Sequence, residues 1–478
     1  MLRFTFILLL VSFIGNAQNR VSIPDANFAA FLNEHYPTAM NGSILDTENP
    51  KIVHEDSLFC SALYIENFTG LEYFKNLKVL DCSSNFAQNL PQLSSHLIWL
   101  NCSANYLKNL PVLGKKLRHL DCSKNQLNSI APLSEKLIYL NISYNQIESI
   151  SKFPKGLKTF IGNGNQLKKI PYGSALIELN CANNQLTELG ELPEILIVLN
   201  CANNQIKQLN ELPKWLKNLN CANNQLTYLP PLPERLTRLE VSLNYLEKIE
   251  SLPTTLVVLD CSENKLTSLP ALPQTLQELM CASNQLKTLP SLPSGLKSLW
   301  CSFNKIRKLS ELPSGLSYFY ANDNEINCLP ILPKEIEFGG LSNNPISCIP
   351  SEEHWMENEI VSLPICEKSI DEKHIDCYAI SEGFENSSIQ HFKFNGNTNL
   401  NENEIVVYPN PTDGKVTVAS KNCLEVITIK DIEGKTIKEL TPLRNTIEID
   451  LSDLINGIYF IQTSLKEDIK VHKIIKTN

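Results

Sequence analysis

Cysteines that recur at a fixed spacing are the residues of this chain that most suggest metal binding or thiol chemistry. Nine of the fifteen cysteines occupy one position of a repeat of about 20 residues, and histidines do not accompany them. In stacked parallel strands, neighbouring thiols would lie about 4.8 Å apart, which is too far for two sulfurs to share one tetrahedral metal without distortion. We therefore favour packing in a core over a metal site. The nine are Cys82, Cys102, Cys122, Cys181, Cys201, Cys221, Cys261, Cys281 and Cys301.

Other catalytic signals are missing. The sequence has no GxSxG, no HExxH, no phosphate-binding loop and no dinucleotide fingerprint. The acids Glu178, Glu240, Asp260 and Glu263 form no acid–base pair that their spacing supports. We predict no catalytic residue, no metal and no cofactor, and an enzyme of unrecognised type stays as a third hypothesis.

The charge argues against nucleic acid as a partner. The formal net charge is −9 and the isoelectric point about 5.5, and no run of lysine and arginine stands out. Binding to a phosphate backbone needs a basic surface.

The elements that would position these cysteines come from the repeat itself. From residue 77 on, a variant of LxxLxCxxNxLxxL occurs fourteen times, and its asparagine recurs after 20 residues, once after 19. Around Asn224, the side chains of Leu216, Leu219 and Cys221 would point inward while Asn218 and Asn220 alternate outward, as in a short strand. The cysteine position also holds Ile, Val and Leu, so it is a buried apolar site.

The second half of each repeat predicts the opposite side of the solenoid. Its LPxLP pattern cannot continue a helix, so we expect an irregular or polyproline-like convex side and a curved horseshoe. The repeated asparagine is predicted to be buried and to bond backbone groups of its own and neighbouring turns. One repeat has Gly162 in the cysteine position and one residue fewer, so we expect a local kink or loosened packing there.

This repeat resembles the leucine-rich repeat family, and the short LPxLP unit is similar to that of a bacterial subclass found in secreted effectors and surface proteins. The resemblance implies an α/β-type solenoid dominated by short parallel β-strands over residues 71–350, with about fourteen repeats. Some of those effectors carry a ubiquitin-ligase domain after the array, but only a short cap and one further domain follow here.

The ends of the chain indicate export. Residues 1–18 have the layout of a cleaved secretory signal peptide, with a buried N-terminal helix as the alternative, and no other segment approaches transmembrane length. Residues 19–70 are predicted to be a helical N-terminal cap, and 351–404 a C-terminal cap and polar linker. A disulfide between Cys348 and Cys366 is one hypothesis, and a Cys328–Cys348 bridge is its rival.

Residues 405–478 predict a small all-β sandwich, from alternating apolar residues and turn signals. The YPNP segment at 408–411, the Gly457-Ile458-Tyr459 turn and the basic tail at 470–476 resemble the type A sorting domain of type IX secretion cargo. The resemblance implies transfer across an outer membrane by that machinery, to a secreted or outer-surface location. A carbohydrate-binding or adhesive sandwich is the alternative.

The candidate binding residues are the outward strand positions, where aromatic residues gather near the C-terminal end of the array. We predict binding of a macromolecule, with a protein favoured and a glycan as the alternative, in adhesion or host interaction. Stacking of the rings over neighbouring strands, without any ligand, is equally open. The candidates are Trp99, His119, Tyr139, Asn180, Asn200, Asn220, Asp260, Trp300, Phe303, Tyr318, Tyr320 and Phe338.

Overall fold

The structure is a computed structural model that describes most of the repeat array and of the C-terminal domain. It covers residues 19–346 except 131 and 328, and residues 405–476 except 409–411, 413, 425, 432–434, 441–443, 455–456 and 466–467. The predicted signal peptide, the C-terminal cap and linker, and both disulfide hypotheses lie outside the described residues.

The N-terminal cap combines the predicted helix with a small antiparallel sheet of order β1-β3-β2. The Asp25 carboxylate caps the helix by accepting the Phe28 backbone N–H at 2.9 Å, which satisfies a donor that has no partner within the helix. Phe28 and Leu32 are fully buried. The cap elements are β1 (Arg20–Ser22), α1 (Ala26–His35), β2 (Met40–Asn41), β3 (Ile44–Asp46) and α2 (Pro50–Val53).

A single parallel sheet of fifteen strands, β4 to β18, runs through the solenoid in sequence order. Its first strand lies inside the range predicted for the cap, so the sheet begins before Leu71, where a short 3-10 helix (Leu71–Tyr73) precedes β5. The strands are β4 (Ser57–Phe59), β5 (Val79–Asp81), β6 (Trp99–Asn101), β7 (His119–Asp121), β8 (Tyr139–Asn141), β9 (Thr159–Ile161), β10 (Glu178–Asn180), β11 (Val198–Asn200), β12 (Asn218–Asn220), β13 (Arg238–Glu240), β14 (Val258–Asp260), β15 (Glu278–Met280), β16 (Ser298–Trp300), β17 (Tyr318–Tyr320) and β18 (Phe338–Gly340).

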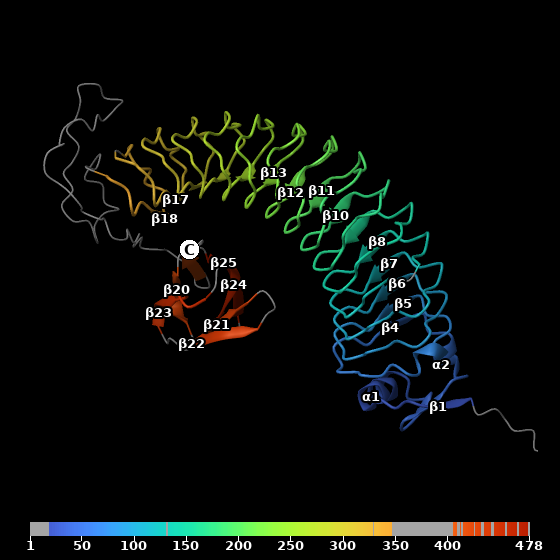
Figure 1. Cartoon of the computed structure of the whole chain (residues 1–478). Coiled ribbons are helices and arrows are strands. Elements are labelled where there is room, and N and C mark those ends of the chain that lie inside the picture. Colours follow the sequence, from blue (N-terminus) through green and yellow to red (C-terminus); the bar gives the residue numbers. More distant parts are fainter. Residues whose placement is uncertain are drawn as a thin grey trace, which may run out of the picture. The chain divides into compact units, whose positions relative to one another are not determined.

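Each strand of the array is three residues long, and its central side chain faces the core. In β12, Leu219 is buried while Asn218 and Asn220 are half-buried, as the two-residue period of a strand predicts. Figure 1 shows the solenoid as an arc, with the strands on its inner side. Between β5 and β18 the described residues form no helix, so the prediction of an irregular convex side is confirmed.

The repeated asparagine forms the predicted ladder. Asn224 is buried, and its Nδ2 donates to the carbonyls of Cys201, Cys221 and Ala222 at 3.0, 3.1 and 3.2 Å. Its Oδ1 accepts the Ile206 backbone N–H at 3.0 Å. One side chain thus ties together two turns of the chain, and the same pattern holds from Asn85 to Asn344.

Gly162 does not loosen the packing, so that prediction is wrong. A Cβ on Gly162 would lie 2.3 Å from the Phe160 ring, which fills the space that a cysteine occupies in other repeats. The strand β9 pairs in regular register with both neighbours, so the missing residue is absorbed on the convex side. The same pairing of a large with a small residue occurs at β17, where Phe319 takes the leucine position and Ala321 takes the cysteine position. A close-packed core accepts a larger side chain only where a neighbouring one is smaller.

The C-terminal domain is the predicted sandwich of two antiparallel sheets, with orders β19-β20-β23 and β22-β21-β24-β25. Both sheets contribute to one core, for example Val416 and Ile449 from the first and Ile427 and Ile461 from the second. The strands are β19 (Ile405–Tyr408), β20 (Lys415–Leu424), β21 (Val426–Lys430), β22 (Thr436–Leu440), β23 (Arg444–Asp450), β24 (Gly457–Leu465) and β25 (Asp468–Lys476).

Candidate binding face

Parallel pairing without register shifts places equivalent strand residues in straight rows on the inner face of the arc. The residues that precede each buried leucine form one row, and those that follow it form another. The first row holds Trp99, His119, Tyr139, Tyr318 and Phe338. The second row holds Asn180, Asn200, Asn220, Asp260, Trp300 and Tyr320.

Three rings of the first row stack on consecutive strands near the start of the array. The centroids of Trp99 and His119 lie 5.1 Å apart, and those of His119 and Tyr139 lie 4.1 Å apart with planes only 3° from parallel. Burial lowers the pKa of His119, and the nearby Asp121 carboxylate partly opposes this. Burial therefore favours the neutral imidazole, which forms one layer of an aromatic stack.

A second aromatic cluster covers β16, β17 and β18 and spans both rows. Trp300 and Tyr320 lie 4.9 Å apart in the second row, while Tyr318 and Phe338 lie 5.4 Å apart in the first. The Trp300 indole N–H donates to the Ser298 hydroxyl at 2.7 Å, which fixes the indole ring. Cross-strand stacking of the predicted residues is thus observed in both clusters.

The members of this cluster differ in how much surface they present. Phe338 is buried at 9% exposure, so its ring supports Tyr318, which is 41% exposed. Phe303 is 44% exposed but belongs to the turn after β16, where its backbone is left-handed with a φ of 56°. It therefore borders the face formed by the strands.

The polar middle of the second row has a structural task that sequence reasoning missed. The Oδ1 atoms of Asn180, Asn200 and Asn220 accept the backbone N–H two residues later, at 3.3, 3.2 and 3.0 Å. Such bonds shape the turn that ends each strand. The signal was available as a polar residue two positions before Ser or Ala, as in Asp81 and Ser83, which share the same bond.

Acidic side chains on this face are engaged in different ways. Glu240 accepts hydrogen bonds from Asn220 Nδ2 and from Arg238 Nε. Asp260 accepts the Ser262 backbone N–H at 3.1 Å. Burial raises the pKa of Glu263, and the Asp260 carboxylate adds to that rise.

The cysteine ladder is buried as predicted, and its chemistry is suppressed. The ten cysteines whose side chains the structure describes are free thiols in the core. Burial raises the pKa of Cys201 and of Cys301 to about 12, because a thiolate would lose its hydration there. These thiols stay protonated near neutral pH and act as small apolar side chains.

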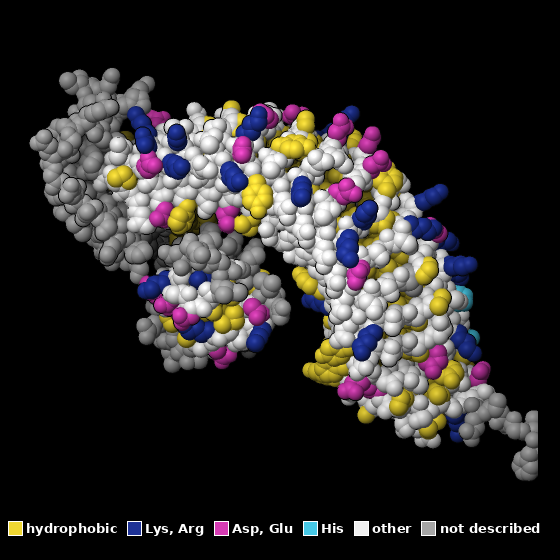
Figure 2. Space-filling model, viewed as in Figure 1, with side chains coloured by type: hydrophobic (Ala, Val, Ile, Leu, Met, Phe, Trp, Pro, Cys, Tyr) yellow, Lys and Arg dark blue, Asp and Glu magenta, His cyan; other side chains and the backbone are white. Residues whose placement is uncertain are grey.

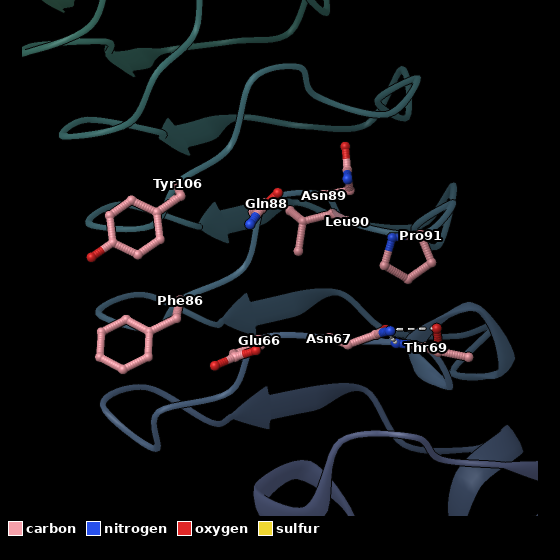
Figure 3. Close-up of a pocket in the computed structure, with 9 residues that line it drawn as sticks. All are labelled: Glu66, Asn67, Thr69, Phe86, Gln88, Asn89, Leu90, Pro91 and Tyr106. Atoms are coloured by element: carbon pink, nitrogen blue, oxygen red, sulfur yellow. Dashed lines mark hydrogen bonds between the residues drawn. The ribbon is translucent and has the colours of Figure 1, made fainter.

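A hollow of about 730 Å³ on the flank of the first repeats is lined by residues that were not among the binding candidates predicted from the sequence. Figure 3 shows Phe86 and Tyr106 on one side of it, with Glu66 and Gln88 next to them and Asn89 farther along the turn. The available signal was an aromatic residue directly after the ladder asparagine, where later repeats mostly have glutamine.

The surface of the solenoid is otherwise mixed in charge. Figure 2 shows lysine and arginine interspersed with aspartate and glutamate on the visible face of the array. No helix among the described residues is long and apolar enough to cross a membrane. Among the same residues, no group of three or more His, Cys, Asp or Glu side chains is arranged to hold a metal ion.

Residues 406–477 match a family described as a secretion system C-terminal sorting domain. Among curated proteins, none matches the chain. Solved structures similar to the chain are leucine-rich repeat proteins. YopM from Yersinia enterocolitica is 38% identical over 59% of this chain and 63% of its own, with a TM-score of 0.57. This chain thus spans less than two thirds of that protein.

Two further structures agree with the fold. A leucine-rich effector protein, YopM from Yersinia pestis, is 34% identical over 55% of this chain and 77% of its own, with a TM-score of 0.54. The functional domain of InlJ from Listeria monocytogenes, described as including a cysteine ladder, is 21% identical over 96% of this chain and 99% of its own, with a TM-score of 0.61. The last shows the fold alone.

Proposed function

We propose that this chain is an exported protein that binds a protein partner through the inner face of its solenoid, because it belongs to the leucine-rich repeat family and ends in a secretion system sorting domain. The sorting domain indicates export, with attachment or release at the outer surface. The similar structures are repeat proteins of the interaction type, which favours binding over catalysis. Adhesion or host interaction is the role we assign to this binding.

The aromatic cluster of β16 to β18 carries the proposal. Trp300 of β16 and Tyr318 and Tyr320 of β17 bring three partly exposed rings together on two neighbouring strands. Trp and Tyr are the residues most often found as anchors in protein interfaces. Because each ring is already held by a neighbour, it loses little conformational freedom when a partner packs on it, which favours affinity.

The polar residues in the middle of the face fit a supporting role beside these aromatic anchors. The turn-closing bonds of Asn180, Asn200 and Asn220 use their Oδ1 atoms, which makes them weaker candidates for anchors than the rings. We place them, with Asp260 and the stack of Trp99, His119 and Tyr139, at the periphery of the contact.

The test is a Trp300→Ala and Tyr320→Ala double variant of the full chain. We expect it to lose capture of the protein that the parent chain retains from surface extracts of host or bacterial cells. Trp215→Ala is the matched control, because Trp215 is 50% exposed and lies outside the strands, under Arg235. A folded double variant that captures the same protein equally well would refute the proposal. A glycan array bound equally by parent and control, but not by the double variant, would assign the face to glycans instead.

A further inference from the structure

The flank hollow is lined by two exposed aromatic side chains, Phe86 and Tyr106. Phe86 and Tyr106 follow the ladder asparagine in successive repeats, their centroids are 5.9 Å apart and their planes differ by 21°. Figure 3 shows the two rings side by side, and at this separation they stack with an offset that leaves part of each ring face open. We call these exposed rings the platform. They are 41% and 47% exposed.

A third ring extends the platform toward the N-terminal cap. Tyr64 occupies the same position one turn earlier, its centroid lies 5.7 Å from that of Phe86 with the ring planes tilted by 56°, and it is 68% exposed. The next turn in the other direction has Gln126 at this position. The aromatic row is therefore confined to the first three turns and is bounded at both ends.

Polar side chains line the hollow beside the rings. Glu66, Gln88 and Asn89 are exposed and extend from the same turns as the rings (Figure 3). Within the part of the chain that the structure describes, the carboxylate of Glu66 and the side-chain amide of Gln88 make no hydrogen bond. By contrast, Asn67 and Thr69 bond each other at 2.7 Å.

This combination selects one ligand chemistry. A pyranose ring has a face of C–H groups that packs on an aromatic face, and hydroxyl groups at its edge that donate and accept hydrogen bonds. Glu66 can only accept, whereas an amide side chain such as Gln88 does both. A proline-rich peptide also packs on aromatic rings, but its backbone offers mainly carbonyl acceptors, which a carboxylate cannot bond. The negative charge of Glu66 disfavours an acidic ligand.

We propose that the platform of Tyr64, Phe86 and Tyr106, together with Glu66 and Gln88, is a binding site for a neutral polysaccharide. Rings that repeat at 5.7 and 5.9 Å along the solenoid fit a polymer that lays successive sugar rings along the same direction. The site is separate from the inner face and does not rest on the function proposed for that face.

The experiment is affinity electrophoresis of the full chain through gels that contain laminarin, xylan or mannan as neutral probes, or alginate as an acidic one. We expect retardation by at least one neutral polysaccharide. Phe86→Ala or Tyr106→Ala should weaken that retardation about tenfold each, the loss expected when a stacking partner of about 1.4 kcal/mol is removed. Gln88→Ala should weaken it less.

Tyr245→Ala is the matched control, because Tyr245 has the same position in its repeat and is 49% exposed, with Lys265 over its ring. It should leave retardation unchanged. Circular dichroism and native migration in gels without polysaccharide should be the same for all variants. The proposal is overturned by lack of retardation in every neutral gel, or by retardation that the Phe86→Ala, Tyr106→Ala double variant retains. It is equally overturned if decaproline, and no polysaccharide, binds in a platform-dependent way.

Discussion

Replacing Asn224 with alanine isolates the contribution of one rung of the asparagine ladder. The side chain makes four hydrogen bonds, three from Nδ2 and one to Oδ1. The three carbonyls that accept from Nδ2 each keep another donor: Asn204 bonds that of Cys201, Asn244 that of Cys221, and the Asn203 backbone N–H that of Ala222.

The remaining bond decides the magnitude. The Ile206 backbone N–H has Asn224 Oδ1 as its partner and is buried, so the alanine variant leaves it unsatisfied. An unsatisfied buried donor costs about 1–3 kcal/mol. We therefore expect the Asn224→Ala variant to lose about that much stability. Asn224→Asp keeps the acceptor for Ile206 but turns a carboxylate oxygen toward the carbonyls, so we expect a larger loss near neutral pH.

The assay is urea unfolding followed by circular dichroism, with hydrogen exchange as a local readout. The Ile206 amide should lose protection in Asn224→Ala. Asn210→Ala is the matched control, because Asn210 is exposed and bonds the carbonyl of Gly190 at 3.3 Å, and it should change stability by less than about 0.5 kcal/mol. An unchanged midpoint together with an unchanged exchange rate at Ile206 would refute the account of the ladder.

Three further predictions concern the core. Gly162→Ala should destabilise the chain by about 1–3 kcal/mol, since its Cβ would overlap the Phe160 ring. The double change Phe160→Leu, Gly162→Cys should recover most of that loss in the same unfolding assay. If the stability losses from changing the two positions simply add, the packing account is contradicted. A thiol reagent should label at most five of the fifteen cysteines in the folded chain, because ten are buried, and rapid labelling of more would contradict their burial. Burial raises the pKa of these thiols above 9.0, for instance that of Cys201 to about 12, so the thiols of the unfolded chain ionise first as the pH rises. The free energy of unfolding should therefore be at its full value below about pH 8 and fall between pH 9 and 12. An alkaline titration that shows no such fall would contradict this prediction.

Aromatic and polar side chains of the array differ in how far their roles could be anticipated. Cross-strand stacking such as that of Tyr318 on Phe338 was one of two open alternatives, because a fixed register brings equivalent positions together but leaves the ring rotamers undecided. The flank hollow near Phe86 was missed, because its residues come from turns, where the backbone conformation decides which way a side chain points. The filling of the Gly162 site by Phe160 depends on a neighbour two residues away, which a position-by-position reading of the repeat does not weigh.

The solenoid, its parallel strands, the burial of the leucine, cysteine and asparagine rows and the sandwich of the C-terminal domain could all be predicted from the amino-acid sequence. These follow from a strict repeat and a two-residue period, which are local properties of the chain. The tertiary structure was needed to show that the long sheet starts at β4 and that exposed rings line a hollow on the flank. Those features arise from contacts between residues about 20 positions apart, where side-chain volume and rotamer choice, and not the repeat pattern, set the outcome.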